Sequence, residues 1–259
     1  MKSLCLALSL VPTALLLPLA ALADEYGLKS VGLGVSASQS PYAGAGTSLS
    51  LLPLLNYEGE HLFVRGLHAG LHLYQGEGFG LDVIVAGRFD GIDADDFGRR
   101  ELAENGIDRD LLEDRDDGLD LGLQASWKGA LGELQASVRG DVSGASDGYE
   151  LSMEYGYPLQ LGSATVTPSL ALNHLSSDLA DYYYGTLRDE EQRGVLRYRP
   201  GSALVPSLSL GLSQPLGERW LINGEASYRM LPDRLSDSPL SEGDSGQFGV
   251  KVGLSWLFD

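Results

Sequence analysis

The sequence predicts an all-β protein, a closed antiparallel transmembrane β-barrel of about twelve strands, with ten as the alternative. Short periplasmic turns and longer external loops are expected to join the strands. Three observations carry this prediction: a signal-like N-terminus, strand-length segments that alternate between apolar and polar residues, and a last segment that alternates up to a terminal aromatic residue. Because lipid tolerates only helices and closed sheets, a membrane protein built from such strands must be a barrel.

Residues 1–23 have the features of a secretory signal peptide. The apolar run Leu4–Leu19 follows an early lysine, and Ala21-Leu22-Ala23 fits the small-x-small cleavage rule. We therefore expect cleavage near Ala23 and one outer-membrane β-barrel domain over residues 24–259. The expected location is the outer membrane of a Gram-negative cell.

The composition excludes several classes of partner and site. The chain has 18 basic and 36 acidic residues, a net charge of −18, which argues against nucleic acid as a partner. Its single cysteine, Cys5, lies in the predicted signal peptide, so we expect neither a disulfide nor a cysteine metal site in the mature chain. His68 and His72 would lie roughly 13 Å apart on a strand, too far to share a metal. We interpret the acidic run Asp90–Asp120 as a solvated loop, and we expect no metal and no cofactor.

Alternation recurs along the whole mature chain, in segments near the length that a tilted barrel strand needs. One face is apolar, and the other is small, polar or charged, as with Arg88, Glu150 and Lys251. Charges on this second face fit a small barrel whose lumen is filled by paired side chains. The predicted strands are Lys29–Ala37, Thr47–Tyr57, Leu62–Tyr74, Gly80–Phe89, Leu119–Trp127, Glu133–Val142, Tyr149–Tyr157, Ala164–Leu175, Ala203–Gln214, Trp220–Leu231 and Gln247–Phe258.

These segments number eleven, whereas a bacterial barrel with both termini in the periplasm needs an even number. Either Lys29–Ala37 stays outside the barrel, which gives ten strands, or a strand is hidden in or before the acidic run, which gives twelve. We favour twelve because Lys29–Ala37 alternates well. In Leu62–Tyr74, the alternation places Phe63 on the face of Leu67, and Arg65 breaks the pattern. The long connections, Asp90–Gly118 and Ser176–Ser202, are expected outside, and the short ones are expected in the periplasm: Gln75–Gly78, Lys128–Leu131, Pro158–Gly162 and Pro215–Arg219.

The C-terminal segment is expected to act in assembly. Trp256 and Phe258 lie on its apolar face, and Phe258 is followed only by Asp259. A last strand that ends on an aromatic residue is typical of outer-membrane barrels. We therefore predict that Trp256 and Phe258 are part of the signal that the outer-membrane assembly machinery recognises.

Several blocks of the mature chain resemble one known family. The stretch VTPSLALNHLSSDLADYYYGT, residues 166–186, is similar to the signature region of the MipA/OmpV family of MltA-interacting outer-membrane proteins. Further blocks match in the same order along the chain: GLGVSASQSPYAGAG at 32–46, LPLLNYEGEHLFV at 52–64, DVSGASDG at 141–148 and LPDRLSDSPL at 231–240. The resemblance covers essentially the whole mature chain.

The resemblance implies a structural role without enzymatic activity. The founding member of the family is regarded as a scaffold that brings a murein-degrading transglycosylase together with a murein synthase. We therefore expect an outer-membrane scaffold whose partners are murein hydrolase and synthase, besides outer-membrane lipid and lipopolysaccharide. A small pore and an adhesion-type surface antigen are the alternatives that involve no catalysis.

Two features of residues 166–186 leave alternatives open. His174 and Ser176 form a His-x-Ser pattern like that of PagL-type lipid A deacylases, so they are weak candidates for the catalytic residues of a lipid-modifying hydrolase. Tyr182, Tyr183 and Tyr184 could form a partner or loop surface. Alternatively, these tyrosines could fold a long external loop over the barrel mouth.

Overall fold

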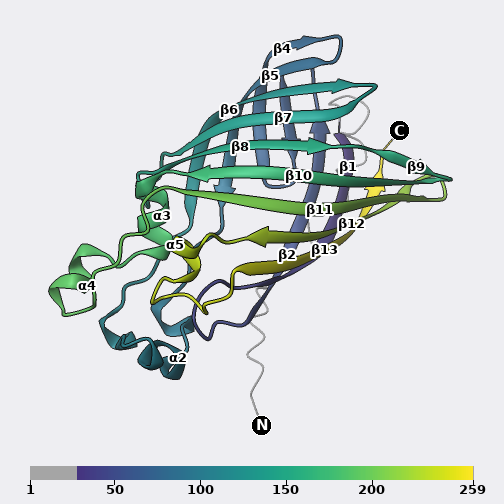
Figure 1. Cartoon of the computed structure of the whole chain (residues 1–259). Helices are drawn as coiled ribbons and strands as arrows, with labels where there is room; N and C mark the ends of the chain where they lie inside the picture. The colour runs from purple at the N-terminus through teal and green to yellow at the C-terminus, as the bar shows by residue number, and fades with distance from the viewer. Residues whose placement is uncertain (1–27, 259) are drawn as a thin grey trace, which may run out of the picture.

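The computed structural model describes residues 28–258, which form one continuous antiparallel sheet with short helices in its loops (Figure 1). The predicted signal peptide, its cleavage site and Asp259 lie outside the described residues. The strands are β1 (Leu28–Gln39), β2 (Thr47–Glu58), β3 (Leu62–Arg65), β4 (His68–Gly76), β5 (Phe79–Arg88), β6 (Gly118–Gly129), β7 (Gly132–Asp141), β8 (Tyr149–Gly156), β9 (Leu159–Leu161), β10 (Ala164–Leu175), β11 (Ala203–Leu216), β12 (Trp220–Met230) and β13 (Gly246–Leu257). The helices are α2 (Arg99–Glu104), α3 (Ser177–Tyr184), α4 (Arg188–Gln192) and α5 (Asp233–Ser236), with 3₁₀ turns η1 (Ala94–Asp96) and η2 (Arg109–Leu111).

The sheet closes on itself as a barrel of twelve strand positions. Strand β13 pairs with β1 over nine residue pairs from Ser30↔Leu257 to Ser38↔Gly249, which joins the last strand to the first. Strands β8 and β9 both pair with β10, one beyond the other, so together they occupy one position in the wall. The prediction of a closed antiparallel barrel of about twelve strands is confirmed. An even count leaves both ends of the barrel chain on the same side.

The twelfth strand is hidden in the segment Leu62–Tyr74, which was expected to be a single strand. It is two strands, β3 and β4, joined by a tight turn at Gly66, whose φ of +61° favours glycine. Arg65, where the alternation fails, is the last residue of β3. The turn exchanges the inner and outer faces, so the prediction that Phe63 shares the face of Leu67 was wrong. Phe63 is 2% exposed, and its ring stacks on that of His72 at 4.9 Å.

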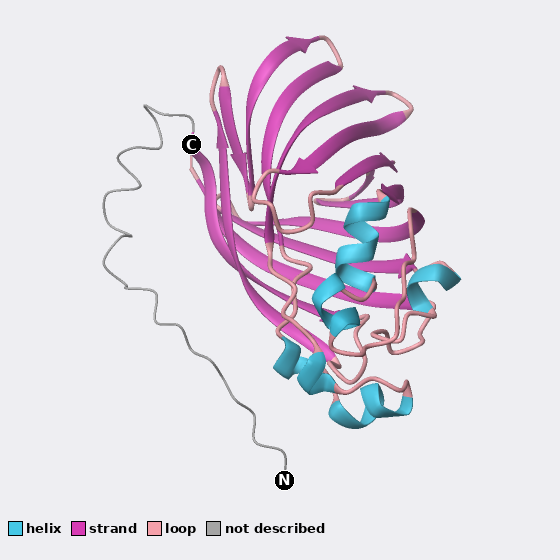
Figure 2. Ribbon diagram, turned by 90° about the vertical axis from the view of Figure 1, so that its left-hand side faces the viewer, coloured by secondary structure: helices cyan, strands magenta, loops and turns pink. Residues whose placement is uncertain are grey.

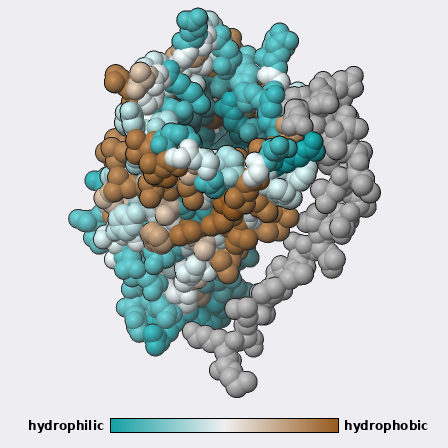
Figure 3. All heavy atoms as spheres, turned by 90° about the vertical axis from the view of Figure 1, so that its right-hand side faces the viewer, coloured by the Kyte–Doolittle hydropathy of each residue, from teal (hydrophilic) through white to brown (hydrophobic). Residues whose placement is uncertain are grey.

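The outer face of the barrel is apolar. Leu49, Leu51, Leu170 and Val252 are each more than half exposed, as befits side chains that face lipid. In Figure 3 hydrophobic residues gather across the middle of the strand surface, between hydrophilic regions. No helix within residues 28–258 is both long and apolar enough to cross a membrane.

The wall is interrupted beside β2. Strand β3 pairs with β2 only at Asn56–Glu58, and no described strand pairs with this edge of Thr47–Leu54. The Leu55 carbonyl accepts a hydrogen bond from Gly66 N at 2.7 Å, so the backbone groups of alternate residues, including Pro53, face the open edge. Proline lacks the N–H group that would be left unpaired there, which fits its preference for edge strands. The half of the barrel nearest the long loops therefore has a notch between β2 and β5.

Candidate functional site: a folded cap over a charged lumen

The long loops fold together into a cap at one end of the barrel, while the connections that residues 28–258 place at the other end are short turns (Figures 1 and 2). Four loops contribute, with residue ranges 40–46, 89–117, 176–202 and 231–245. They enclose two hydrophobic clusters. The first consists of Leu175, Leu179, Ala180, Tyr183, Tyr184, Ala203, Val205, Leu231 and Leu235. The second consists of Tyr42, Ala43, Phe97, Leu102, Ile107, Leu112, Val195 and Leu240. The cap is thus a folded unit with cores of its own.

A buried ion pair ties two of these loops together. Arg115, from the acidic run, forms hydrogen bonds with both carboxylate oxygens of Glu190 at 2.7 and 2.9 Å, and both side chains are fully buried. The remaining guanidinium N–H groups donate to the carbonyls of Glu113, Tyr182 and Gly185. Complete pairing offsets the cost of taking two charges out of water. The run expected to be a solvated loop therefore forms part of the cap.

The tyrosines predicted as a partner or loop surface are mostly interior. Tyr183 and Tyr184, on α3, are 2% and 7% exposed. They pack in the first hydrophobic cluster, and the half-buried Tyr182 packs against it. Burial raises the pKa of Tyr183 and Tyr184, which keeps both phenols neutral. These residues match the alternative, an aromatic cluster that folds a long loop over the mouth.

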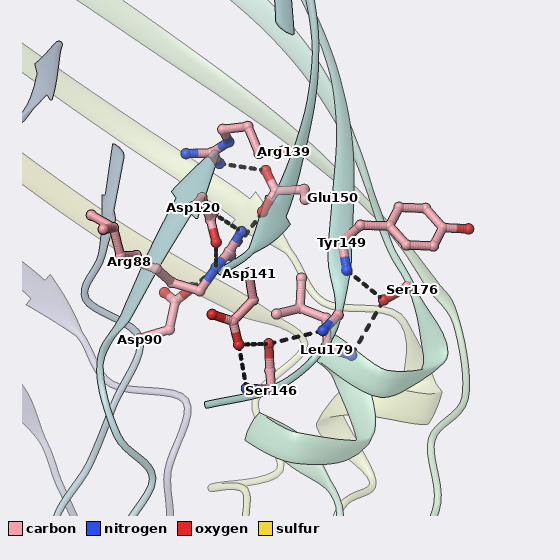
Figure 4. Close-up of polar contacts among 12 residues, drawn as sticks. Arg88, Asp90, Asp120, Arg139, Asp141, Ser146, Tyr149, Glu150, Ser176 and Leu179 are labelled. Atoms are coloured by element: carbon pink, nitrogen blue, oxygen red, sulfur yellow. Dashed lines mark hydrogen bonds and ion pairs between the residues drawn. The ribbon is translucent and has the colours of Figure 1, made fainter. Parts of the chain in front are cut away.

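The two residues of the His-x-Ser pattern have separate contacts. Ser176 is the N-cap of α3, and its buried Oγ accepts hydrogen bonds from Leu179 N at 3.3 Å and Tyr149 N at 2.9 Å (Figure 4). His174 stacks on the ring of Tyr149 at 6.4 Å, and its Nδ1 has no hydrogen-bond partner within residues 28–258. The described residues show no hydrogen bond between His174 and Ser176. Ser176 thus serves as a helix cap.

Below the cap, the part of the lumen wall nearest to it carries a network of paired charges (Figure 4). Arg88 binds Asp120 at 2.5 Å and Glu150 at 3.0 Å, and Arg139 binds the other oxygen of Glu150 at 2.9 Å. These residues come from β5, β6, β7 and β8, so the network joins four neighbouring strands on the inner face of one side of the wall. The expectation of charges paired on the inner face is confirmed here.

The block DVSGASDG, residues 141–148, surrounds the carboxylate of Asp141 with backbone N–H groups at the rim of the barrel. Asp141, the last residue of β7, accepts hydrogen bonds from the backbone N–H groups of Ser143, Gly144, Ser146 and Asp147 at 2.6–3.2 Å. Asp147 has a φ of +54°, the one positive φ of a non-glycine residue within the described chain. The aspartate therefore holds a tight turn between β7 and β8, and this role explains the spacing of the block.

A second polar cluster lies near the other end of the lumen. His72 contacts Asp82 at 2.7 Å and Glu58 at 3.1 Å, and Glu58 also binds Arg65 at 2.9 Å. His68 lies apart, in a cavity with Arg139. Within residues 28–258, no group of three or more His, Cys, Asp or Glu side chains is arranged to hold a metal ion.

The lumen contains cavities whose linings overlap. One of about 440 Å³ lies under the cap, and Arg229 lines both it and a cavity of about 240 Å³ at the charged network. Arg139 in turn lines both that cavity and one of about 260 Å³ beside His68. The interior is therefore polar and only partly filled by side chains.

The comparisons with known proteins identify the family. The family model for MltA-interacting protein MipA matches residues 31–258, nearly the whole described chain. The chain belongs to the MipA family. The MltA-interacting protein of Escherichia coli (strain K12) is 30% identical over 241 residues, which cover 92% of this chain and 94% of the relative. The putative outer membrane protein YiaT of the same strain is 30% identical over 233 residues, 88% of this chain and 90% of the relative.

This MipA-family chain is also similar, at lower identity, to one further relative and to one solved structure. The outer membrane protein OmpV of Vibrio cholerae is 26% identical over 140 residues, 54% of each chain. The solved CymD monoaromatic hydrocarbon channel has a TM-score of 0.38 and 10% identity over 93% of this chain and 91% of that one. With the barrel fold, the similarity in sequence to the outer membrane proteins YiaT and OmpV makes the protein an integral outer-membrane β-barrel.

Sequence reasoning missed the residues that organise the site of this MipA-family barrel. It did not pair Arg115 with Glu190, which are 75 positions apart, or Arg88 with Glu150. The available signal was weak: Arg115 is one of few basic residues in an acidic run. Trp256 lies near the end of β13, where it meets Trp220 edge to face at 4.9 Å, and Phe258 directly follows this strand. Their role in assembly stays a prediction.

Proposed function

We propose that this protein is a non-enzymatic scaffold of the outer membrane that holds a murein hydrolase and a murein synthase together at its periplasmic end. The observation that carries the proposal is membership of the MipA family, with a relative over 94% of its length that is named for interaction with MltA. The absence of enzymatic activity is part of the proposal. It is supported by the role of Ser176 as a helix cap, whose Oγ accepts two backbone hydrogen bonds and, among the described residues, has no hydrogen bond to His174 that could activate it.

The geometry favours the end of the barrel opposite the cap as the contact surface. Short periplasmic turns and long external loops are the rule in bacterial barrels, so the turns face the cell wall. Exposed carboxylates stand on three of these turns, at Glu60, Glu77 and Glu218. The β4–β5 turn is held to β6 by a hydrogen bond of 2.8 Å from Lys128 N to Gly78 O, which gives the surface a fixed shape.

The proposal includes contacts outside the periplasm. The exposed leucines and valines of the strands would contact outer-membrane lipid, and the cap would lie among lipopolysaccharide. Trp256 and Phe258 would engage the assembly machinery before the barrel closes. Phe258 N donates to Lys29 O at 3.0 Å, so the end of the chain is already paired with the first strand in the folded state.

A binding experiment tests the scaffold. The detergent-solubilised protein is immobilised, and a purified murein lytic transglycosylase and a bifunctional murein synthase are passed over it together. We expect both enzymes to be retained. Replacing Glu60, Glu77 and Glu218 with lysine should lower the retention of both enzymes about tenfold. The lysines would lie opposite positive groups of the partner, and like charges across an interface are strongly unfavourable.

The matched control reverses three exposed carboxylates on the cap, Asp93, Glu104 and Asp189, to lysine. This variant has the same net charge as the first but should retain both enzymes as the wild type does. If the wild type retains neither enzyme, or if both variants lose them equally, the scaffold proposal is wrong. Heat-modifiable migration of each protein in gels shows separately that the barrel is folded.

A further inference from the structure

The cavity of about 440 Å³ under the cap has two side chains with unmet hydrogen-bonding capacity. Arg229 of β12 and Gln247 of β13 are direct partners in the strand register, and both line this cavity. Facing residues on adjacent antiparallel strands have Cβ atoms about 5 Å apart. The two side chains therefore present their polar groups side by side.

Arg229 differs from the other lumen arginines. Arg88 and Arg139 bind carboxylates directly, whereas the guanidinium of Arg229 forms no hydrogen bond or ion pair with any residue of 28–258. It is half-buried and lies where the 440 Å³ cavity meets the 240 Å³ cavity. A guanidinium offers five N–H donors in a planar fork that matches a carboxylate.

Gln247 offers a hydrogen-bond acceptor, whereas Arg229 offers donors. Its side chain is 8% exposed, and its Oε1 has no hydrogen-bond partner among the described residues. Its Nε2 donates to Gln39 O at 3.4 Å, which leaves the amide oxygen as the unmet group. A buried acceptor without a donor is costly, so a ligand hydroxyl or amine that reached this oxygen would be favoured.

The floor of the cavity is built from small residues. Ser38, Gly249 and Ser227 lie at one level across β1, β13 and β12. A Cβ added at Gly249 would stand 3.0 Å from Ser227 Oγ and 3.8 Å from Ser38 Cβ, so any larger side chain fills the floor. On the cap side, the cavity is lined by the rings of Tyr42 and Tyr184, whose centroids lie 6.2 Å apart. Hydroxyls below and aromatic rings above give the cavity the mixture of polar and apolar groups that can hold a small hydroxylated ligand.

The charged side chains around the cavity determine which ligand charge the cavity favours. Asp90 also lines it, and this carboxylate already binds Arg88 at 3.3 Å. The charge of Arg229 favours a ligand that carries a negative charge, and the carboxylates of Asp90 and Glu150 beside it offset part of this attraction. The cavity also borders the notch in the wall, since Ser48 of β2 and Phe89 after β5 both line it.

We propose that this cavity binds a sugar acid, a small hydroxylated carboxylate. Arg229 holds the carboxylate through two parallel N–H···O bonds, and Gln247 Oε1 accepts a ring hydroxyl. The serine hydroxyls bind the remaining hydroxyls. The ligand is either a free sugar acid that enters through the lumen or a sugar-acid headgroup that a glycolipid presents through the notch. The binding function is independent of the proposed contact with murein enzymes, which lies at the opposite end.

Calorimetric titration of the detergent-solubilised protein with glucuronate tests the proposal. We expect saturable binding of glucuronate and none of glucose, which has the same ring and hydroxyls but no charge. Arg229→Gln should weaken glucuronate binding about tenfold or more, because it removes a charge-assisted bidentate contact. Gln247→Leu should weaken binding by less, and Gly249→Val should abolish it by filling the floor.

The matched control is Arg197→Gln, which removes an exposed arginine from the cap and should bind as the wild type does. Heat-modifiable migration confirms that each variant is folded. A second titration uses micelles of a glycolipid with a glucuronate headgroup. Arg229-dependent binding of the glycolipid alone assigns the headgroup as the ligand, and binding of free glucuronate assigns the soluble acid. If folded wild-type protein binds neither probe, or if folded Arg229→Gln binds as tightly as the wild type, the proposal is overturned.

Discussion

Replacing Arg115 with alanine should open the cap while leaving the barrel folded. The change leaves Glu190 charged, buried and without its partner, and loss of one member of a buried pair costs about 3–5 kcal/mol. Arg115 also joins the loop 89–117 to three backbone carbonyls, two of them in the loop 176–202, so both loops lose their common anchor. Hydrogen exchange should therefore speed up throughout these two loops but not in β6 or β10.

An exposed ion pair of the cap provides the control for this result. Arg99 and Asp110 form a bidentate pair at 2.5 and 2.9 Å, but both side chains are more than half exposed. Exposed pairs contribute about 0–1 kcal/mol, so Arg99→Ala should leave exchange nearly unchanged. The double variant Arg115→Met/Glu190→Leu should recover much of the protection, since no charge is then left buried. Unchanged protection in Arg115→Ala would show that the buried pair does not hold the cap.

Gly32→Val should prevent the barrel from closing. Gly32 lies on β1 at the seam with β13, and a Cβ built there collides with the carbonyl oxygen of Leu254 and stands 2.6 Å from the Cα of Ser255. Both atoms are backbone and cannot rotate away. Forcing extra atoms into such a contact costs about 3 kcal/mol or more, at the one pairing that joins the ends of the sheet. We expect little or no heat-modifiable protein in the outer membrane.

The same substitution at Gly211 is the matched control. Gly211 lies on β11, and a Cβ there meets only Thr167 O at 3.6 Å and Thr167 Cβ at 3.8 Å, which are ordinary contacts. Gly211→Val should fold in nearly normal amounts. Wild-type levels of folded Gly32→Val would mean that the seam between β1 and β13 is looser than the register indicates.

Residue alternation predicted most of the barrel because it is a local property of each strand. Strand β13, for example, spans Gly246–Leu257 against a predicted Gln247–Phe258. The error at Leu62–Tyr74 has a local cause too, since a two-residue turn at Gly66 restores the alternation with its faces exchanged. The need for an even number of strands correctly indicated that one had been overlooked.

The site was harder to predict because its contacts join distant parts of the chain. Glu190 meets Arg115, and Arg229 meets Gln247, only after the barrel has brought their strands and loops together. Composition identified the acidic run but not the one arginine within it that becomes fully buried. The tyrosines of α3 were recognised as a cluster, yet the choice between surface and core depended on packing against β10, β11 and α5.

Labelling of single cysteines in intact cells tests most directly whether the cap faces outward and the short turns face the cell wall. In a Cys5→Ala background, a cysteine is introduced at Asp93 on the cap or at Glu77 on the β4–β5 turn, both exposed. A membrane-impermeant maleimide should label Asp93→Cys in intact cells and Glu77→Cys only after the outer membrane is permeabilised. Labelling of Glu77→Cys in intact cells, with Asp93→Cys protected, would contradict both the orientation and the periplasmic scaffold.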